Sequence, residues 1–266
     1  MIGEEKRLKM SHGKTCYFEG GTGYPAVMLH GAGFTSGGYS WLNVMQTIGD
    51  QYHCYAMDCL NFGPGDVFDE EFSFAYMVDH VREFMDLLEL DKAHVLGRSM
   101  GGWIATLFAY ESPERVNKLV LQAPGGAATR PLQNMVNFKV PEDERIRQAV
   151  ESSLKDVDVD PEPIVQEYLG KAHDPAQVDG FAQVMKHMTA PLTRQRYNTV
   201  RRLPFIKAPT LVCWGTADQT NDFSLAEVVH GVIKGSKLAV FEGAGHGICD
   251  ERPAEFAKEV LAFLSD

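Results

Sequence analysis

The spacing of hydrophobic positions changes in a regular way along the chain. Short apolar runs predict buried strands, and they lie at 25–29, 52–57, 93–96, 118–122, 210–214 and 237–241. An earlier segment, 15–18, predicts an edge strand. Between the runs, apolar residues recur every three or four positions and predict helices at 39–48, 73–90, 103–109, 224–233 and 253–264. This alternation predicts an α/β fold with a mostly parallel central sheet flanked by helices.

The alternation stops between residues 127 and 204, where no convincing strand is found. Helical spacing continues there over 142–154, 161–172 and 175–188. Asp160 and Asp174 each precede a proline, a common way to begin a helix. We therefore predict a core domain formed by residues 1–126 and 205–266, with a helical cap (lid) of residues 127–204 inserted between two strands.

Composition narrows the possible partners. The chain has 266 residues, of which 44% are hydrophobic and 23% charged, as in ordinary globular domains. Its formal net charge is −11 and it has no strongly basic cluster, which argues against nucleic acid and anionic membranes. No apolar run is long enough to span a bilayer. We expect a cytoplasmic protein with a small-molecule substrate, and a homo-oligomer stays open.

The cysteines predict neither a metal site nor a disulfide framework. There are five, no two are spaced as CxxC, and Cys54 and Cys213 fall inside predicted strands. We expect free thiols in a reducing compartment, no metal and no cofactor.

The first candidate for chemistry is Ser99, within Gly97-x-Ser99-x-Gly101 between the strand at 93–96 and the helix at 103–109. A strand that turns into a helix over so few residues forces its apex into a strained conformation, and flanking glycines relieve the clashes. The serine hydroxyl then projects at a helix N-terminus, where free backbone amides can stabilise an oxyanion.

A base and an acid follow later predicted strands. His246 comes after 237–241 with a glycine on each side, and Asp218 lies on the turn that follows 210–214. A serine needs a base to take its proton, and the imidazole needs a carboxylate to orient it. Asp222 is a less favoured alternative to Asp218, and Asp58 is interpreted as a turn-forming aspartate. Ser99, Asp218 and His246 thus form a candidate catalytic triad.

A glycine-rich loop, His30-Gly31-Ala32-Gly33-Phe34, directly follows the strand at 25–29. Such a loop brings backbone close to a ligand, so its amides can form half of an oxyanion hole. The amide of Ala32 is the preferred donor and that of Gly33 the alternative. We expect His30 to hold the loop by hydrogen bonds.

Together these segments resemble the α/β-hydrolase superfamily over nearly the full length. The matching pieces are the 30–33 loop, the serine turn at 97–102, Trp214-Gly215-x-x-Asp218 and Gly245-His246. The residues 30–41, 99–102 and 123–126 are similar to those of meta-cleavage-product hydrolases. Those enzymes cut a carbon–carbon bond in vinylogous 1,5-diketone acids formed in aromatic-ring degradation. The resemblance implies backbone amides of Ala32 and Met100 as oxyanion donors.

The resemblance also implies a basic cap residue for the substrate carboxylate, for which Arg194 and Arg196 are candidates. Two positions differ from those hydrolases. Arg98 stands where they usually have asparagine, and Gly247 stands where they usually have tryptophan.

For the substrate pocket we expect Gly33, Phe34, Arg98, Met185 and Met188, and further apolar walls from Met100, Trp103, Met135 and Phe138. The leading interpretation is a serine hydrolase of small, mostly apolar esters or lactones. The alternative is a carbon–carbon bond hydrolase that uses the same triad. A ligand-binding receptor built on this fold is a third hypothesis.

Overall fold

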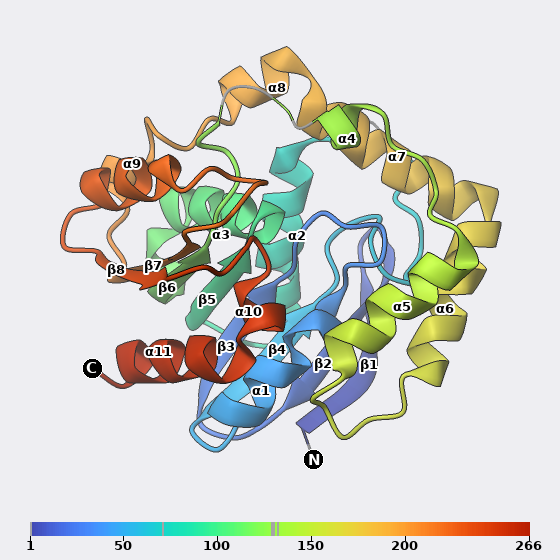
Figure 1. Ribbon diagram of the computed structural model, residues 1–266, viewed down its shortest axis with the longest axis horizontal. Coiled ribbons are helices and arrows are strands. Elements are labelled where there is room, and N and C mark those ends of the chain that lie inside the picture. The colour runs from blue at the N-terminus through green and yellow to red at the C-terminus, as the bar shows by residue number, and fades with distance from the viewer. Residues whose placement is uncertain (1, 71, 129–130, 132) are drawn as a thin grey trace.

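The computed structural model describes residues 2–70, 72–128, 131 and 133–266. A central sheet is flanked by helices and partly enclosed by an arc of further helices (Figure 1). In chain order the elements are β1 (Ile2–Met10), β2 (Gly13–Gly20), β3 (Tyr24–Leu29), η1 (Gly38–Trp41), α1 (Leu42–Ile48), β4 (Tyr52–Met57), α2 (Phe74–Leu87), β5 (Ala93–Arg98), α3 (Met100–Glu111), η2 (Pro113–Arg115), β6 (Val116–Gln122), α4 (Gln133–Val136), α5 (Asp143–Leu154), α6 (Glu162–His173), α7 (Pro175–Thr189), α8 (Pro191–Arg196), η3 (Leu203–Phe205), β7 (Thr210–Gly215), α9 (Ser224–Val232), β8 (Lys237–Phe241), α10 (Ile248–Glu251) and α11 (Pro253–Ser265).

The sheet has eight strands in the order β1-β2-β4-β3-β5-β6-β7-β8. The first two pairings, β1 with β2 and β2 with β4, are antiparallel, and every later pairing is parallel. Leu29 pairs with Gly97, and Gly97 pairs with Leu121, so the carboxyl ends of β3, β5 and β6 share one edge. The loops that follow these strands therefore meet where open α/β sheets bind ligands.

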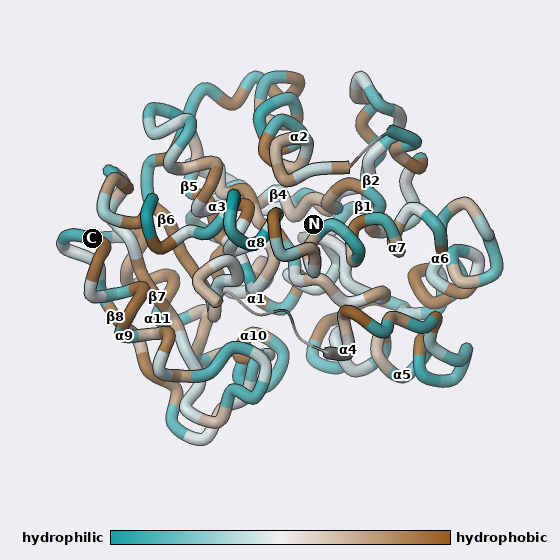
Figure 2. The backbone as a smooth tube through the Cα atoms, turned by 90° about the horizontal axis from the view of Figure 1, so that it is seen from above, coloured by the Kyte–Doolittle hydropathy of each residue, from teal (hydrophilic) through white to brown (hydrophobic). Residues whose placement is uncertain are grey.

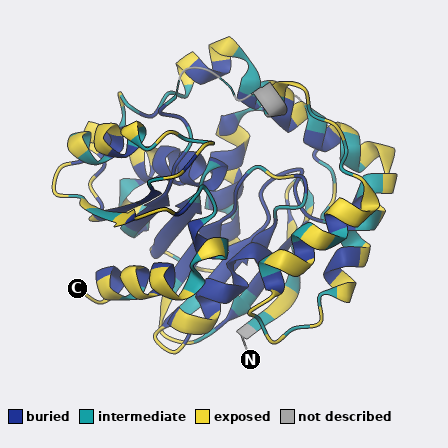
Figure 3. Ribbon diagram, viewed as in Figure 1, coloured by how far each residue is buried: buried dark blue, intermediate teal, exposed yellow. Residues whose placement is uncertain are grey.

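Helices cover both faces of the sheet. In Figure 1, α1 and α11 lie together on one face, and α2 and α3 lie on the other. The central strands are almost completely buried because parallel strands have helices on each side. Figure 3 shows these strands in dark blue and the outward faces of the surrounding helices in yellow. The predicted fold class is confirmed.

Residues 127–204, called the inserted segment below, lie between β6 and β7 and contain α4 to α8. These helices form an arc along one side of the sheet and over its carboxyl edge (Figure 1). Each longer helix buries one face; on α5 the buried residues are Ile146, Val150 and Leu154. Viewed from above in Figure 2, teal and brown residues alternate around these helices, as amphipathic packing requires.

Two features near the N-terminus differ from the prediction. β1 was not predicted, because its residues are mostly charged and mark an exposed edge strand. β1 covers β2, so the segment predicted as an edge strand at 15–18 lies inside the sheet, and that prediction was wrong.

The short helices α8 and α10 were also not predicted. Among the described residues, no helix has the length and apolar character needed to cross a bilayer.

Candidate active site

Ser99 occupies the turn between β5 and α3. Its backbone has φ 53° and ψ −112°, a combination that residues other than glycine rarely adopt. A Cβ atom on Gly97 would lie 2.4 Å from the carbonyl oxygen of Gly101, and one on Gly101 would lie 2.1 Å from that of Leu29. Only glycines fit on both sides of the serine, and the strained turn presents its hydroxyl at the carboxyl edge of the sheet.

Three hydrogen bonds fix the backbone of Ser99. Its amide donates to the Gln122 carbonyl at 2.9 Å, and its carbonyl accepts from the amides of Trp103 at 3.0 Å and Gly125 at 2.7 Å. These partners come from β6, α3 and the loop after β6. The strained turn is therefore held by neighbouring elements, and the side chain alone is left to move.

His246 and Asp218 meet at the same edge of the sheet. Nδ1 of His246 lies 2.8 Å from Oδ2 of Asp218, whose carboxylate is buried. The other oxygen, Oδ1, accepts from the amides of Thr220 at 2.8 Å and Asn221 at 2.9 Å. These bonds aim one carboxylate oxygen at the imidazole. The arrangement can hold the ring with its other nitrogen directed away from the carboxylate.

Asp222, the alternative acid, lies elsewhere. Its Oδ1 accepts hydrogen bonds from the amide and hydroxyl of Ser224, at 2.9 Å and 2.5 Å, at the start of α9. These bonds lower the pKa of its carboxyl group. The structure thus brings Asp218, and not Asp222, to His246.

Two residues that the sequence analysis missed hold the His246 loop. The side-chain amide of Gln122 donates to the His246 carbonyl at 2.7 Å. The carboxylate of Glu251 accepts from the amides of Gly245 at 2.8 Å and Gly247 at 3.1 Å. A polar glutamine directly after the apolar residues 119–121 was the one available signal for the first of these contacts.

Two backbone amides beside Ser99 are free. Within the described ranges, the amides of Ala32 and Met100 donate to no protein acceptor. Met100 begins α3, where the amide has no partner in the preceding turn. The amide of Gly33, the alternative donor, is already used because it donates to Ser36 Oγ at 2.9 Å. The free pair suits a negative charge that develops on a bound carbonyl oxygen.

His30 has a structural environment. Its Nε2 accepts from the Cys59 amide at 2.9 Å, and its Nδ1 lies 2.7 Å from the Gly31 carbonyl. Nδ1 therefore carries the proton and donates it to that carbonyl. Complete burial lowers the pKa of His30 to about 3, so the ring stays neutral and braces the loop.

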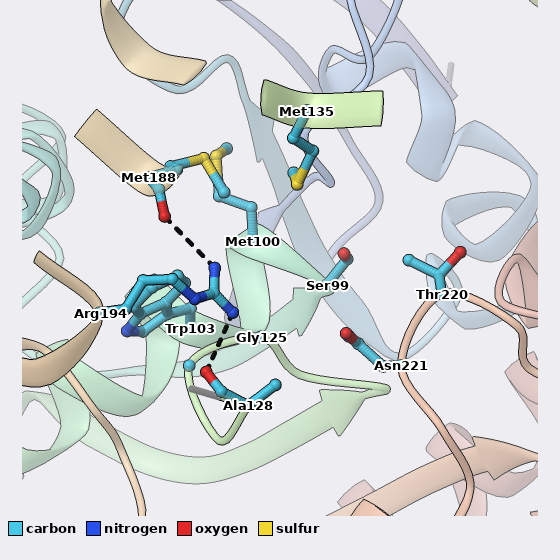
Figure 4. Close-up of a pocket in the computed structure, with 11 residues that line it drawn as sticks. Ser99, Met100, Trp103, Gly125, Ala128, Met135, Met188, Arg194, Thr220 and Asn221 are labelled. Carbon is cyan, nitrogen blue, oxygen red and sulfur yellow. Dashed lines mark hydrogen bonds between the residues drawn. The ribbon is translucent and has the colours of Figure 1, made fainter. Parts of the chain in front are cut away.

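Two pockets meet at Ser99 and share Met135 and Thr220. The pocket called the His246 pocket below is lined by Gly31, Ala32, Gly33, Ser36, Arg98, Ser99, Met135, Thr220 and His246. The pocket called the Trp103 pocket is lined by Ser99, Met100, Trp103, Gly125, Gly126, Ala128, Met135, Met188, Arg194, Thr220 and Asn221 (Figure 4). A ligand whose reacting carbonyl sits at Ser99 would therefore extend to both sides.

The His246 pocket contains a neutralised cation. The Arg98 guanidinium forms an ion pair with Asp250 at 2.6 Å and donates to Cys249 Sγ at 3.2 Å. A Cβ on Gly247 would lie 3.2 Å from both Arg98 Nη2 and Asp250 Oδ2. The absence of a side chain at Gly247 therefore leaves room for this ion pair.

The Trp103 pocket contains a cation without a carboxylate partner. Arg194 is 7% exposed, and its guanidinium donates to the carbonyls of Met188 at 3.2 Å and Ala128 at 3.0 Å. Figure 4 shows these two bonds beside the Trp103 ring, whose centroid is 5.4 Å away. The Nε of Arg194 is buried and has no hydrogen-bond partner among the described residues. Burial lowers the pKa of the Arg194 guanidinium. Among the described residues, no carboxylate lies within ion-pair distance of it.

The remaining predicted pocket residues separate into two groups. Gly33 and Arg98 line the His246 pocket, Met100, Trp103 and Met188 line the Trp103 pocket, and Met135 lines both. Phe34 and Met185 are buried and line neither; Phe34 packs against the rings of Phe138 and Phe181. Arg196 lies outside both pockets, with its guanidinium 5.7 Å from the Tyr197 ring centroid.

The cysteines agree with the sequence analysis, since all five are buried free thiols. Across the described ranges, no group of three or more histidine, cysteine or acidic side chains is arranged to hold a metal ion.

Known proteins share this arrangement of elements. A 2-hydroxy-6-oxo-6-phenylhexa-2,4-dienoate hydrolase of Comamonas testosteroni is 32% identical over 267 residues, which cover 93% of this chain and 90% of that protein. A 2-hydroxy-6-oxononadienedioate/2-hydroxy-6-oxononatrienedioate hydrolase of the same organism is 30% identical over 264 residues, with the same two coverages of 93% and 90%. The solved structure of a meta-cleavage product hydrolase of Pseudomonas fluorescens IP01 is 25% identical, with a TM-score of 0.79 over 99% of this chain and 98% of that chain.

Residues 25–253 match the sequence profile of the family described as alpha/beta hydrolase fold. The match runs from β3 to the start of α11 and includes the turn at Ser99 and the loops of Asp218 and His246. The chain therefore belongs to the α/β-hydrolase family and is a hydrolase.

Proposed function

We propose that this hydrolase cleaves a carbon–carbon bond next to a ketone in an unsaturated substrate that carries a carboxylate. The observation that carries the proposal is the unpaired guanidinium of Arg194 in a pocket that Ser99 also lines. Relatives whose names describe dienoate hydrolases support the same substrate class. The sequence alone narrowly favours ester cleavage. The Arg194 guanidinium and the relatives' names favour carbon–carbon cleavage instead.

The buried charge of Arg194 favours an anionic substrate. Removing a cation from water costs several kcal/mol unless an anion or dense hydrogen bonding compensates it. Two backbone carbonyls satisfy part of the guanidinium, and within the described ranges its Nε has no partner. A substrate carboxylate would supply the missing charge, whereas a neutral ester would leave it uncompensated.

The proposed reaction begins at Ser99. His246, which Asp218 holds in orientation, takes the hydroxyl proton of Ser99 while the serine oxygen bonds to the ketone carbon. The amides of Ala32 and Met100 stabilise the resulting oxyanion. When the carbon–carbon bond breaks, its electron pair passes to the departing fragment, which takes at carbon the proton that His246 removed from Ser99. Water then hydrolyses the acyl-serine and restores the enzyme.

We also propose that residues 127–204 act as a cap domain over a core formed by residues 1–126 and 205–266. The inserted segment supplies Ala128, Met135, Met188 and Arg194 to the Trp103 pocket. The triad and both free amides come from the core. The cap would then recognise the substrate and exclude water, while the core performs the chemistry.

Ester or lactone hydrolysis is the second candidate. Arg98 in the His246 pocket is neutralised by Asp250, so that side of Ser99 offers no free cation for a second acid group. Apolar walls from Met100, Trp103 and Met188 suit a small acyl chain. Ester cleavage needs only the triad and the two amides, because the alkoxide leaves with a proton from His246. A receptor without turnover is disfavoured because it has no need for the His246–Asp218 contact beside a strained serine.

Steady-state kinetics on a panel of ring-fission dienones, lactones and short esters tests this proposal. We expect kcat/KM for a carboxylate-bearing dienone to exceed that for every ester by at least about a hundredfold, or about 2.7 kcal/mol of transition-state preference. Equal or faster ester turnover would assign the protein to the second candidate. Saturable binding of the dienone without turnover of any substrate would assign it to the receptor class.

A further inference from the structure

The loop of residues 30–34 carries one of the two free amides, and its far end is held by the inserted segment. Phe34 closes this loop, two residues after Ala32. Its ring centroid lies 5.1 Å from that of Phe181 and 5.8 Å from that of Phe138, both in the inserted segment. Its carbonyl accepts a hydrogen bond from Nζ of Lys171, in α6, at 3.2 Å.

Lys171 is an unusual residue for such a position. It is 3% exposed, and its Nζ lies 4.7 Å from the Phe34 ring centroid, 5.2 Å from Phe181, 5.5 Å from Tyr168 and 5.7 Å from Phe62. Throughout the described part of the chain, no carboxylate approaches it within ion-pair distance. Of the described residues, Phe34 thus supplies, through its carbonyl, the one hydrogen-bond partner of the ammonium.

The charges around Lys171 do not compensate its burial. Asp58, at the end of β4, is the carboxylate that acts on it, and its Oδ1 accepts from the Gly38 amide at 2.7 Å. Burial lowers the pKa of Lys171 to about 7 although Asp58 opposes this change. Burial also raises the pKa of Asp58 to about 7. An apolar side chain of similar length would fill this space without the desolvation cost, so packing alone does not account for a lysine here.

We propose that Lys171 is a positioning residue that fixes the 30–34 loop through the Phe34 carbonyl and so couples the inserted segment to the Ala32 amide. The proposal rests on the proposed function, because it assumes that the Ala32 amide stabilises an oxyanion. Apart from the ring contacts of Phe34, the remaining hydrogen bonds of this stretch are made within the core. Ser36 holds Gly33, and the Tyr39 hydroxyl donates to the Thr35 carbonyl.

The expected signature is a change in kcat with KM preserved. An oxyanion donor acts on charge that appears only in the transition state, and it must lie about 2.7–3.1 Å from that oxygen. A loop released at Phe34 would misplace the Ala32 amide while the Trp103 pocket, which this loop does not line, keeps its walls. Misplacement by about 1 Å can cost about a hundredfold in rate.

The test compares Lys171→Met with Tyr168→Phe. Methionine fills similar space without a donor, whereas the control removes a buried hydroxyl of the same cluster that makes no hydrogen bond to any described residue. We expect Lys171→Met to lower kcat by about tenfold to a hundredfold with KM within about twofold, and to weaken a trifluoromethyl ketone inhibitor in proportion. Tyr168→Phe should leave kcat and inhibition unchanged. Lys171→Arg, which keeps a cationic donor, should recover part of kcat.

Other results would overturn the proposal. An unchanged kcat in Lys171→Met with a lower Tm would make the lysine a packing residue, and a raised KM alone would place it in substrate binding. A Lys171→Arg variant no faster than Lys171→Met would also contradict the proposal. If Lys171→Met does not fold, Lys171→Gln, whose amide is too short to reach Phe34, takes its place with the same expected result.

The fastest substrate of the panel is used for these assays, because both ester and carbon–carbon cleavage form an oxyanion. A wrong substrate assignment therefore leaves this test intact. Activity retained in Ser99→Ala would instead contradict the proposed function, whatever the Lys171 variants do.

Discussion

The two pockets that meet at Ser99 differ in origin and in charge. The His246 pocket is formed almost entirely by loops that follow β3, β5, β7 and β8, and its cation, Arg98, is paired with Asp250. The Trp103 pocket takes part of its wall from the inserted segment, and its cation, Arg194, has no carboxylate partner among the residues that the structure describes. Under the proposed function, this difference assigns the reaction to the core and the recognition of an anion to the inserted segment.

The largest expected effect concerns Ser99, which both pockets share. Ser99→Ala should lower kcat by about a millionfold, because loss of a triad serine removes the nucleophile and the use of its base together. Circular dichroism and Tm should remain those of the parent, since the backbone bonds of Ser99 do not involve its hydroxyl. Activity within about tenfold of the parent would show that neither pocket is organised around this serine.

The second-largest expected effect concerns Asp218, the carboxylate that contacts His246. Asp218→Asn should lower kcat by about ten-thousandfold, because an amide would hold the imidazole in the wrong tautomer. Asp222→Asn is the matched control, since Asp222 is bonded to Ser224 and not to His246. Steady-state kinetics of both variants measure the difference. The reverse ranking would assign the acid to Asp222.

The part of the site that lies on the core strands could be predicted from the sequence for a physical reason. In a parallel sheet, residues that follow buried strands meet at one edge, so the predicted strand ends at 96, 214 and 241 were enough to place Ser99, Asp218 and His246 at that edge. The glycines around Ser99 and His246 added a local steric signal. Six of the eight strands have clear apolar runs, whereas the charged strand β1 carries no such signal.

The rest of the site depends on contacts between residues far apart in sequence. No local pattern indicates that Asp250 pairs with Arg98, that Glu251 holds the His246 loop, or that Lys171 reaches Phe34. Apolar spacing also cannot separate pocket from core. Met185 and Met188 lie on the same helix and are equally buried, and only Met188 lines a pocket.

Replacement of Arg194 tests the difference in charge between the two pockets. Arg194→Met should lower kcat/KM for a carboxylate-bearing dienone by about a hundredfold, because it removes the partner of a desolvated anion. The rate with a neutral ester should stay within about threefold, a change of well under 1 kcal/mol. Arg196→Met is the control, since Arg196 lies outside both pockets. An equal loss for dienone and ester would make Arg194 a structural residue and remove the argument for an anionic substrate.

The smallest expected effect separates the wall of the Trp103 pocket from the core behind it. Met188→Leu and Met185→Leu conserve volume, so each should cost less than about 1.5 kcal/mol of stability. A branched side chain at 188 changes the shape of the space beside Ser99 and should alter the ratio of kcat/KM between short and long acyl chains by up to about tenfold. The same change at 185 should leave this ratio unaltered, because Met185 lines neither pocket. Competition between two substrates in one reaction measures the ratio directly and is insensitive to the amount of folded enzyme. Equal shifts in both variants would mean that the inserted segment responds as one packed unit, and recognition could then not be assigned to the residues that face Ser99.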